Sequence, residues 1–389
     1  MLSRGHAAPA SLPSVCARPR VGVVGAGQLA RMMVEAEELA GVDVVLLADS
    51  PADSAAGLGA PTIYGSARDP IALARLASET DVVTFDHELL DLDQLRTLRD
   101  TGHLVAPSPN ALRWATDKAH QRRGLHAAGV AVPHFEVVES LGELDEALKA
   151  WSEPPVVKAA SGGYDGRGVV VSRSLDEARR SGAEFLTRSA VVLEERLDLL
   201  AELSQVVVRS ANGDIETYPL VTTVQVAGMC SEVLYPSHTA APDAAALAVE
   251  IAGLIDLVGV MAVELFVTPQ GLVVNELALR PHNSGHWTIE GCQTSQFENH
   301  LRAVAGLDLA STTPRARAVA MVNLVGADEP SDDDARERHP EVSFHLYGKT
   351  WRPGRKLGHV TALGDSLDEV RARAWAAARD WGTREEGDL

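Results

Sequence analysis

Two glutamates in an expected hairpin are candidates to hold a divalent metal ion. Glu264 and Glu276 belong to strand-like runs, Val263 to Val267 and Leu272 to Leu277, which Pro269-Gln270-Gly271 connects. A three-residue loop of this composition is typical of a type I turn closed by a left-handed glycine, and it places Glu264 opposite Glu276. Facing carboxylates destabilise a sheet unless a cation neutralises them, and Mg²⁺ prefers carboxylate oxygens. The hairpin therefore predicts a metal site; the alternative is that one glutamate points to solvent.

Three hydrogen-bond donors follow the second strand of this hairpin directly. Arg280, His282 and Asn283 offer a guanidinium, an imidazole and an amide. Guanidinium groups in particular bind planar or tetrahedral anions through paired hydrogen bonds. The order of residues predicts a metal site that leads into an anion pocket, with nucleotide phosphates as further ligands of the metal.

Charged residues in the middle of the chain are candidates for nucleotide binding. Lys158 lies in an apolar strand, where a lysine is costly unless it is paired or reaches a cleft. Lys118 is an ordinary helix-surface lysine by periodicity alone. Glu194 and Glu195 end a strand, from which a carboxylate commonly meets adenine and ribose, but two solvated glutamates in a turn fit the spacing as well. Glu202 begins the next strand.

The first glycine-rich loop lies between an expected strand and an expected helix. The sequence from Gly25 to Ala30 matches the pattern GxGxxG/A, and Asp49 lies at a separation that suits a ribose hydroxyl. The pattern alone predicts dinucleotide binding. Glycines are also needed wherever a strand turns into a close-packed helix whose N-terminal amides meet an anion. Gln28 and Leu29 are therefore equally candidates to bind the ribose phosphate of a substrate.

A second glycine-rich loop, Ser161 to Gly168, joins two expected strands and lacks the GK[ST] ending of a P-loop. Four glycines in eight residues favour a mobile cover whose amides close over phosphates. Tyr164, Asp165 and Arg167 would project functional groups into the covered space. A long hairpin without such a role would have little use for these side chains among the glycines.

A basic cluster near the C-terminus is a candidate phosphate site. Lys349, Arg352, Arg355 and Lys356 surround a Pro-Gly turn in a chain that is otherwise acidic. Such a cluster suits a phosphate monoester, with a solvated turn as the alternative.

Composition limits the class of protein. The 389 residues are enough for two or three domains. Hydrophobic residues make up 46% of the chain, but no run approaches the ~18 apolar residues that a membrane span requires. The formal charge of −19 argues against a nucleic-acid backbone as the main partner. Cys16, Cys230 and Cys292 form no CxxC pair, so a cytoplasmic protein without disulfides is expected. We expect residues 1–19 to be a disordered extension, with a transit peptide as the weaker alternative.

The elements that position these residues begin with a βαβ pattern and an open α/β sheet. The expected strands are residues 21–27, 42–48, 60–64 and 81–85, and the expected helices are residues 28–40 and 70–77. Residues 105–109 interrupt the pattern and mark a boundary. An α+β region with antiparallel strands follows, and a last segment ends in a strong helix. In this part we expect helices at 110–128 and 366–381, strands at 156–159, 168–171, 190–194 and 202–209, and an acidic loop at 328–338.

Four motifs in this order resemble the ATP-grasp superfamily and, within it, the 5-(carboxyamino)imidazole ribonucleotide synthases. They are GAGQLARM, GGYDGRG, VGVMAVELFVTPQGLVVNELALRPHNSGHWT and RPGRKLGH, and the resemblance covers roughly residues 20–385. It implies a mixed α/β and α+β ATP-grasp fold with an N-terminal Rossmann-like domain and a small C-terminal domain. The implied domains are residues 20–115, 116–312 with a lid at about 154–195, and 313–389.

The resemblance also implies an activity. A member of this family carboxylates 5-aminoimidazole ribonucleotide with ATP and bicarbonate through carboxyphosphate, in purine biosynthesis. The implied cofactors are ATP and Mg²⁺, with Mn²⁺ as an alternative metal. A cytoplasmic homodimer without nucleic-acid or membrane partners is expected.

The implied site residues fall into four groups by their position in the family motifs. The metal ligands are Glu264 and Glu276, and the residues that receive bicarbonate are Arg280, His282 and Asn283. The residues around ATP are Lys118, Lys158, Gly163, Tyr164, Asp165, Gly166, Arg167, Gly168, Glu194, Glu195, Glu202, Gln225, Asn275 and Glu276. The residues around the ribonucleotide are Gln28, Leu29, Tyr164, Asp165, Arg167, Arg280, Lys349, Arg355 and Lys356, and Asp165 is the expected proton acceptor for the substrate amine.

The chain departs from the family pattern at three positions. Leu279 replaces a proline before the anion-pocket arginine, Ala30 replaces a glycine of the first loop, and Gln225 replaces a histidine near the nucleotide. The changes at Leu279 and Ala30 remove no chemical group, and the amide of Gln225 can also donate, but Leu279 could loosen the placement of Arg280. The alternatives are a formate-using glycinamide ribonucleotide transformylase, a nicotinamide-dependent oxidoreductase built on the first loop, and a nucleotide-binding protein without catalysis.

Overall fold

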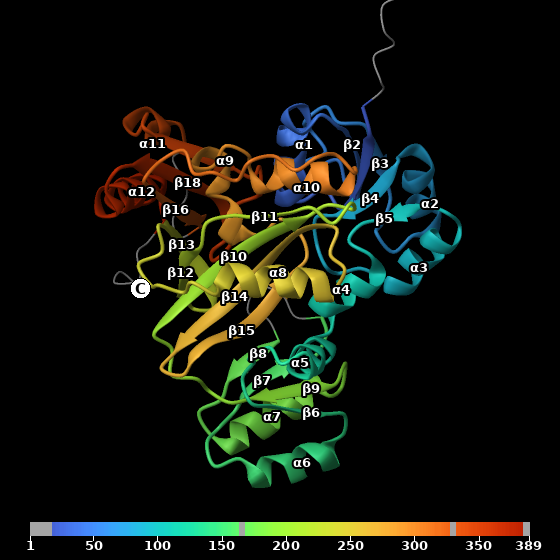
Figure 1. Ribbon diagram of the computed structural model, residues 1–389, viewed down its shortest axis with the longest axis vertical. Helices are drawn as coiled ribbons and strands as arrows, with labels where there is room; N and C mark the ends of the chain where they lie inside the picture. Colours follow the sequence, from blue (N-terminus) through green and yellow to red (C-terminus); the bar gives the residue numbers. More distant parts are fainter. Residues whose placement is uncertain (1–17, 163–167, 327–331, 384–389) are drawn as a thin grey trace, which may run out of the picture.

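The computed structural model describes residues 18–162, 168–326 and 332–383 and contains three β-sheets (Figure 1). A five-stranded sheet lies near the N-terminus, a nine-stranded sheet runs through the centre, and a four-stranded sheet forms the lower end in this view. Within the described ranges, no helix is both long and apolar enough to cross a membrane. The mixed helix and strand content agrees with the expected fold class.

The N-terminal sheet is parallel with strand order β3-β2-β1-β4-β5. This confirms the open α/β sheet expected from the βαβ pattern. Apolar residues of β1 and β2 are buried between helices, which is typical of parallel strands covered on both faces. The elements are β1 (Arg20–Val24), α1 (Gln28–Ala40), β2 (Asp43–Ala48), β3 (Thr62–Tyr64), α2 (Pro70–Glu79), β4 (Val82–Phe85), α3 (Leu92–Asp100) and β5 (Leu104–Val105).

The helix expected at residues 110–128 is in fact two helices. These are α4 (Pro109–Thr116) and α5 (Lys118–Ala127), and Asp117 separates them with an extended backbone. The Asp117 side chain accepts a hydrogen bond from the His120 N–H, so it acts as the N-cap of α5. The break makes Lys118 the first residue of a new helix, which changes the direction of its side chain.

The four-stranded sheet is antiparallel with order β6-β9-β7-β8. Helices α6 and α7 cover one face with an apolar cluster that includes Val157 and Leu193, and α5 lies on the other face beside Val192. Because side chains alternate along a strand, Lys158 points to the α5 face. The elements are β6 (Phe135–Val138), α6 (Leu141–Ala150), β7 (Val156–Ala159), β8 (Val169–Val171), α7 (Leu175–Phe185) and β9 (Val191–Glu194).

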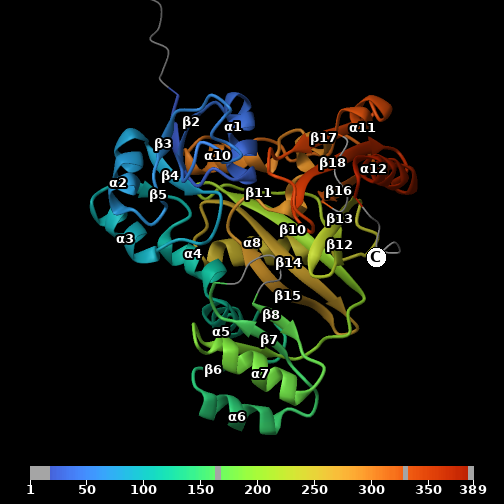
Figure 2. The ribbon, with the colours of Figure 1, turned by 180° about the vertical axis from the view of Figure 1, so that it is seen from behind.

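The central sheet has the order β15-β14-β10-β12-β13-β16-β18-β17, with β11 paired to β10. Pairing of β13 with β16 joins the middle of the chain to its C-terminal part in one sheet, as the view from behind also shows (Figure 2). The strands are β10 (Ala201–Arg209), β11 (Ile215–Thr217), β12 (Val221–Val226), β13 (Met229–Tyr235), β14 (Gly259–Thr268), β15 (Gly271–Ala278), β16 (Ala318–Val325), β17 (Val342–Leu346) and β18 (Lys356–Gly364). The helices are α8 (Ala244–Leu254), the 3₁₀ turn η1 (Asn283–Gly285), α9 (Thr288–Gly291), α10 (Gln296–Val304), α11 (Asp332–Arg338) and α12 (Leu367–Trp381).

Two expectations for the C-terminal part have different outcomes. The helix expected at residues 366–381 is confirmed by α12. The acidic segment at 328–338 is not a loop throughout, because its second half forms α11. Ala335 of α11 is fully buried in the apolar cluster beneath α12, so packing stabilises a helix where charge density suggested a loop.

The hairpin of β14 and β15 confirms the opposition of Glu264 and Glu276 but corrects its loop. Thr268 pairs with Gly271, so the loop contains two residues instead of three. A register shift then follows, which leaves Asn275 as an extra residue between Val274 and Glu276. Such a bulge turns two successive side chains toward one face. The extra residue restores the expected pairing of the glutamates.

Candidate active site

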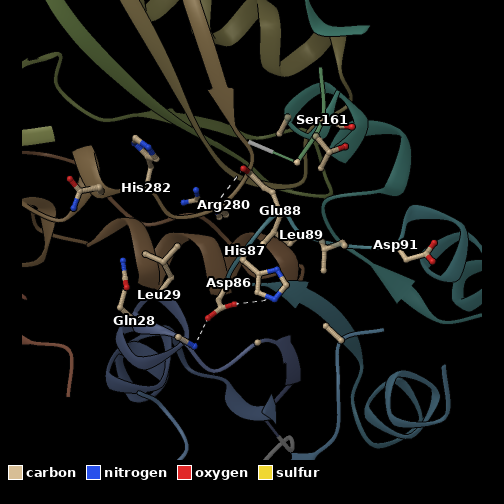
Figure 3. A pocket seen from close by; sticks show the side chains of 18 of the residues that line it. Gln28, Leu29, Asp86, His87, Glu88, Leu89, Asp91, Ser161, Arg280 and His282 are labelled. Carbon is tan, nitrogen blue, oxygen red and sulfur yellow. Dashed lines mark hydrogen bonds and ion pairs between the residues drawn. The ribbon is translucent and has the colours of Figure 1, made fainter. Parts of the chain in front are cut away.

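A cleft of about 1870 Å³ lies between the N-terminal sheet, the α4–α5 region and the C-terminal basic turn. Figure 3 shows that residues from distant parts of the chain face one another across it. Nine of the expected site residues line this cleft: Gln28, Leu29, Lys118, Arg280, His282, Asn283, Lys349, Arg355 and Lys356. We call residues 280–283 the anion loop and residues 349–356 the basic turn. Tertiary structure therefore brings the anion loop, the first glycine-rich loop and the basic turn to one site.

The carboxylates of the hairpin form a compact polar group with three neighbouring side chains. Lys118 ion-pairs with Glu276, and the Asn275 amide donates to Glu264 Oε2 at 3.2 Å. His282 Nε2 lies 3.6 Å from Glu264 Oε1. Lys118 is 9% exposed, so it is not the helix-surface lysine that periodicity indicated. The new helix start at Asp117 directs it inward instead.

The two glutamates carry opposite pKa shifts. Burial and the neighbouring Glu276 raise the pKa of Glu264. Burial also acts to raise the pKa of Glu276, but the positive charges of Lys118, Lys158 and Arg122 together lower that pKa. One carboxylate is thus held charged by a lysine, and the other needs a further cation to ionise at little cost.

This donor set fits a magnesium ion. No group of three or more His, Cys, Asp or Glu side chains is arranged around a metal position in the ranges that the structure covers. Mg²⁺ does not require such a cage, because it usually keeps waters and substrate phosphates beside one or two carboxylates. Glu264 and Glu276 supply those two carboxylates from facing positions of the hairpin.

Lys158, which we expect at the nucleotide phosphates, belongs to a buried network of charged side chains. Lys158 Nζ lies 2.7 Å from Glu194 Oε2, and Arg122 Nε donates to Glu194 Oε1 at 2.7 Å. Burial lowers the pKa of Lys158, although Glu194 opposes that shift. Burial acts to raise the pKa of Glu194, but Lys158 and Arg122 together lower it. Glu194 is therefore not a solvated turn residue, since both its oxygens are engaged by cations.

Arg122 is a residue that the sequence reasoning missed. Its guanidinium is 1% exposed and also donates to the Asn275 carbonyl at 2.6 Å. The bulge in β15 presents that carbonyl. The spacing of Arg122 from Lys118 is i to i+4, which puts both on one helix face, and this was the available signal.

The remaining nucleotide candidates lie in different environments. Glu202 is half-buried on the same face of the central sheet as Glu264. Ser204 pairs with Glu264, and Glu202 lies two residues before Ser204 in β10, so both point to that face. Burial raises the pKa of Glu202. Glu195 is exposed and its carboxylate accepts from the His134 N–H at 3.1 Å. Gln225 is half-buried beside a bulge in β12.

Arg280 lies beside Glu88, as the dashed line in Figure 3 marks, with Arg280 Nε 3.6 Å from Glu88 Oε1. The buried Arg280 Nε finds no hydrogen-bond acceptor among the described residues. An orphaned cationic donor at the wall of a cleft is consistent with an anion pocket. The Leu279 N–H donates to Glu88 Oε1 at 3.2 Å, a bond that a proline at this position could not make. Leu279 therefore ties the loop to Glu88.

His282 is held by its backbone. Its N–H donates to Gln296 Oε1 at 2.9 Å, and its carbonyl accepts from Gln296 Nε2 at 2.7 Å. Burial, followed by the charges of Arg280 and Lys356, lowers the pKa of His282 to about 3. The imidazole is therefore neutral at physiological pH and contacts Ser284 Oγ at 2.8 Å through Nδ1.

The first glycine-rich loop meets a buried carboxylate of this chain. The Gly27 N–H donates to Asp86 Oδ2, and a Cβ at Gly25 would come within 1.8 Å of Asp86 Oδ1. The close approach explains both glycines without a dinucleotide, because Asp86 takes the amide that a pyrophosphate would use. Gln28 faces the other way and accepts a hydrogen bond from Lys349. The loop thus contacts the basic turn.

Asp86 and Glu88 were also missed by the sequence reasoning. Both follow the carboxyl end of β4, which is where open α/β sheets bind ligands, and this position was the signal. Burial raises the pKa of Asp86.

Of the second glycine-rich loop, Gly163, Tyr164, Asp165, Gly166 and Arg167 lie outside the described residues. Gly168 is described and has a left-handed φ of 79°.

Three family models match successive parts of the chain. They are the ribonucleotide synthetase preATP-grasp domain at residues 19–116, the ATP-grasp domain at 123–297 and the phosphoribosylaminoimidazole carboxylase C-terminal domain at 319–373. Together they account for most of the cleft-lining elements.

Curated relatives match most of the chain. The N5-carboxyaminoimidazole ribonucleotide synthase of Mycobacterium bovis is 44% identical over 92% of this chain and 87% of its own length. That of Bacillus subtilis is 35% identical over 90% and 92%.

Solved structures agree with these relatives. An N5-carboxyaminoimidazole ribonucleotide synthetase in complex with ADP is 31% identical, with a TM-score of 0.85 over 93% of this chain and 97% of its own. The Aspergillus clavatus N5-carboxyaminoimidazole synthase, in complex with ADP and 5-aminoimidazole ribonucleotide, is 30% identical with a TM-score of 0.83 over 93% and 98%. The ATP-grasp architecture, the hairpin with its anion loop and these relatives together show that the chain belongs to the N5-carboxyaminoimidazole ribonucleotide synthase family.

Proposed function

We propose that this protein uses ATP and bicarbonate to carboxylate 5-aminoimidazole ribonucleotide, giving N5-carboxyaminoimidazole ribonucleotide in purine biosynthesis. The observation that carries the proposal is the continuity of the site. The carboxylates of the β14–β15 hairpin lead within a few residues to the orphaned donor of Arg280, and the basic turn lies across the same cleft. Nucleotide, small anion and phosphorylated substrate would thus have adjoining positions.

The chemistry follows from the weakness of bicarbonate as an electrophile. Transfer of the γ-phosphate of ATP to bicarbonate gives carboxyphosphate and ADP. The exocyclic amine of the ribonucleotide then attacks the carboxyl carbon, phosphate leaves, and the amine loses a proton. Arg280, neutral His282 and Asn283 would hold the bicarbonate, and Asp165 is the proposed proton acceptor.

Lys118 and Lys158 would contact the ATP phosphates, while Glu202 and Glu195 would face ribose and adenine. Both lysines now pair with carboxylates, so bound phosphate would replace or share those partners. Glu264 and Glu276 would hold Mg²⁺, or Mn²⁺ in its place, and the bound ion would supply positive charge for the phosphate oxygens.

At the other end of the cleft, Lys349, Arg355 and Lys356 would bind the phosphate monoester of the substrate, with Gln28 as a further contact. We also propose that Tyr164 and Arg167 cover the substrate. A cytoplasmic homodimer is part of the proposal, and light scattering of the purified protein tests the oligomeric state.

The deciding experiment is a coupled ADP-release assay with two substrate pairs. We expect ADP release with 5-aminoimidazole ribonucleotide plus bicarbonate, and only background release with glycinamide ribonucleotide plus formate. Stimulation by the second pair alone would overturn the proposal. Tight NADH binding without ATP binding would favour an oxidoreductase, and ATP binding without bicarbonate-dependent hydrolysis would favour a protein without catalysis.

A further inference from the structure

The amide of Asn283 is paired with a second amide that comes from the C-terminal part of the chain. Asn283 Nδ2 donates to Asn323 Oδ1 at 2.8 Å, and Asn323 Nδ2 donates back to Asn283 Oδ1 at 2.7 Å. Asn323 lies in β16 and is 1% exposed, whereas Asn283 begins η1 and lines the cleft. The two residues join the central sheet to the anion loop.

A backbone carbonyl fixes which way round this pair lies. Asn323 Nδ2 also donates to the Cys230 carbonyl at 2.9 Å. A carbonyl oxygen can only accept, so the nitrogen and not the oxygen of Asn323 must face it. The Asn323 oxygen must then face Asn283, and that oxygen in turn requires the Asn283 nitrogen. The carbonyl of Cys230 thereby sets the orientation of both amides.

The pairing leaves one group of Asn283 unused. Each amide nitrogen has two hydrogens, and in a reciprocal pair each amide uses one. Asn323 gives its second hydrogen to Cys230, but the second hydrogen of Asn283 has no acceptor among the described residues. Asn283 lines the cleft with Arg280 and His282, so this free N–H is available to an anion bound there. With the amide reversed, a carbonyl oxygen would repel that anion.

We propose that Asn323 is a positioning residue for the carboxylation reaction, which keeps the Asn283 amide turned so that its free N–H donates to bicarbonate. The inference rests on the proposed function. Asn323 itself touches no substrate and acts through Asn283. The C-terminal domain therefore contributes to the anion pocket as well as to the basic turn.

The test is steady-state ADP release in bicarbonate-depleted buffer, with bicarbonate, ATP and ribonucleotide varied in turn. Asn323→Asp keeps the size of the side chain but removes both donors, and Asn323→Ala leaves Asn283 free to rotate. We expect KM for bicarbonate to rise by about tenfold or more in both variants, the usual effect of one lost hydrogen bond to a charged group. KM for ATP and KM for the ribonucleotide should stay near the wild-type values.

Thr361→Val is the matched control. Thr361 lies two residues from His359, which pairs with Asn323 across β16 and β18, and its buried hydroxyl has no partner in the described ranges. The change alters the same face of the sheet without touching Asn283, so its KM for bicarbonate should not move.

A double-mutant cycle separates positioning from a general structural effect. If Asn323 acts through Asn283, then Asn283→Ala and the double variant Asn283→Ala/Asn323→Ala should have the same KM for bicarbonate. Unchanged KM for bicarbonate in Asn323→Asp and Asn323→Ala, or equal rises in all three KM values, would overturn the inference. A wild-type protein that shows no bicarbonate-dependent ADP release would instead overturn the proposed function.

Discussion

Glu264 lies directly opposite Glu276 across the β14–β15 hairpin, and Lys118 ion-pairs with Glu276. The unequal surroundings raise the pKa of Glu264 and lower that of Glu276. A divalent cation between them would remove the difference. We therefore expect a change in either glutamate to alter how turnover depends on Mg²⁺ concentration.

Replacing Glu276 with glutamine should lower turnover by roughly 100-fold or more, because a metal ion that stabilises transferred charge contributes several kcal/mol. The fold should persist, since the glutamine has the same size and the strand pairing is unchanged. ADP release at increasing Mg²⁺ concentrations measures the effect, and the half-saturating concentration should rise. Glu250→Gln, at an exposed position of α8, is the control. Wild-type turnover in Glu276→Gln would reject the metal assignment.

Deleting Asn275 tests the bulge itself. Without this residue the register of β14 and β15 becomes continuous, so Glu264 should still face Glu276. The deletion removes the carbonyl that accepts from Arg122 and the amide oxygen that accepts from Lys158 at 3.3 Å. We therefore expect weaker ATP binding, which calorimetry measures, in a protein that is still folded, which circular dichroism checks. ATP affinity equal to that of the wild type would show that the bulge has no part in the nucleotide site.

Arg280→Ala should abolish bicarbonate-dependent ADP formation, because the orphaned Nε and its charge are lost from the cleft. Glu88→Gln should have a smaller effect, since it weakens only the ion pair that orients Arg280. Arg99→Ala, on the exposed side of α3, is the control. The anion pocket would be wrongly assigned if Arg280→Ala weakened ribonucleotide binding alone.

His300 should make stability depend on pH. Its Nδ1 accepts from the Val260 N–H, and burial lowers its pKa from 6.5 to about 3. Between these pH values the unfolded chain binds a proton that the folded protein does not. The unfolding free energy should therefore fall as pH drops through this window, by about 1.4 kcal/mol per pH unit for one histidine.

Urea unfolding across this window measures the slope for wild type and for His300→Asn, whose amide oxygen can still accept from Val260. We expect the slope to decrease by about one proton in this variant. His238→Asn, at an exposed position, should keep the wild-type slope. Equal slopes in the wild type and His300→Asn would contradict the prediction.

A turn residue offers a gain in stability. Ala227 and Gly228 connect β12 to β13 with φ values of 50° and 78°, as in a type I′ turn. Left-handed backbone is unfavourable for alanine and better tolerated by asparagine. Ala227→Asn should raise the unfolding free energy by about 0.5–1 kcal/mol, and thermal melting measures it. Ala240→Asn, which lies outside the left-handed region, should not stabilise; equal stabilisation of both would point to another cause.

Local patterns predicted those parts of the fold that depend on neighbours in sequence. Alternation around a turn sufficed to oppose Glu264 and Glu276, and the helical pattern of residues 366–381 sufficed for α12. The same reasoning missed the break at Asp117, because the apolar period continues through it while the aspartate caps a new helix. It also assigned three residues to a loop that has two, since a bulge farther along compensates.

The sequence by itself, through its residue types and the order of its motifs, predicted the ATP-grasp family, the carboxylate pair, the anion loop and the basic turn. Only the tertiary structure decided the burial of Lys118, the engagement of Arg122, the approach of Asp86 to the glycine loop and the pairing of Asn283 with Asn323. The physical reason is distance along the chain. Each of these contacts joins residues at least 40 positions apart or depends on a break between helices, and such packing leaves no local period in the sequence.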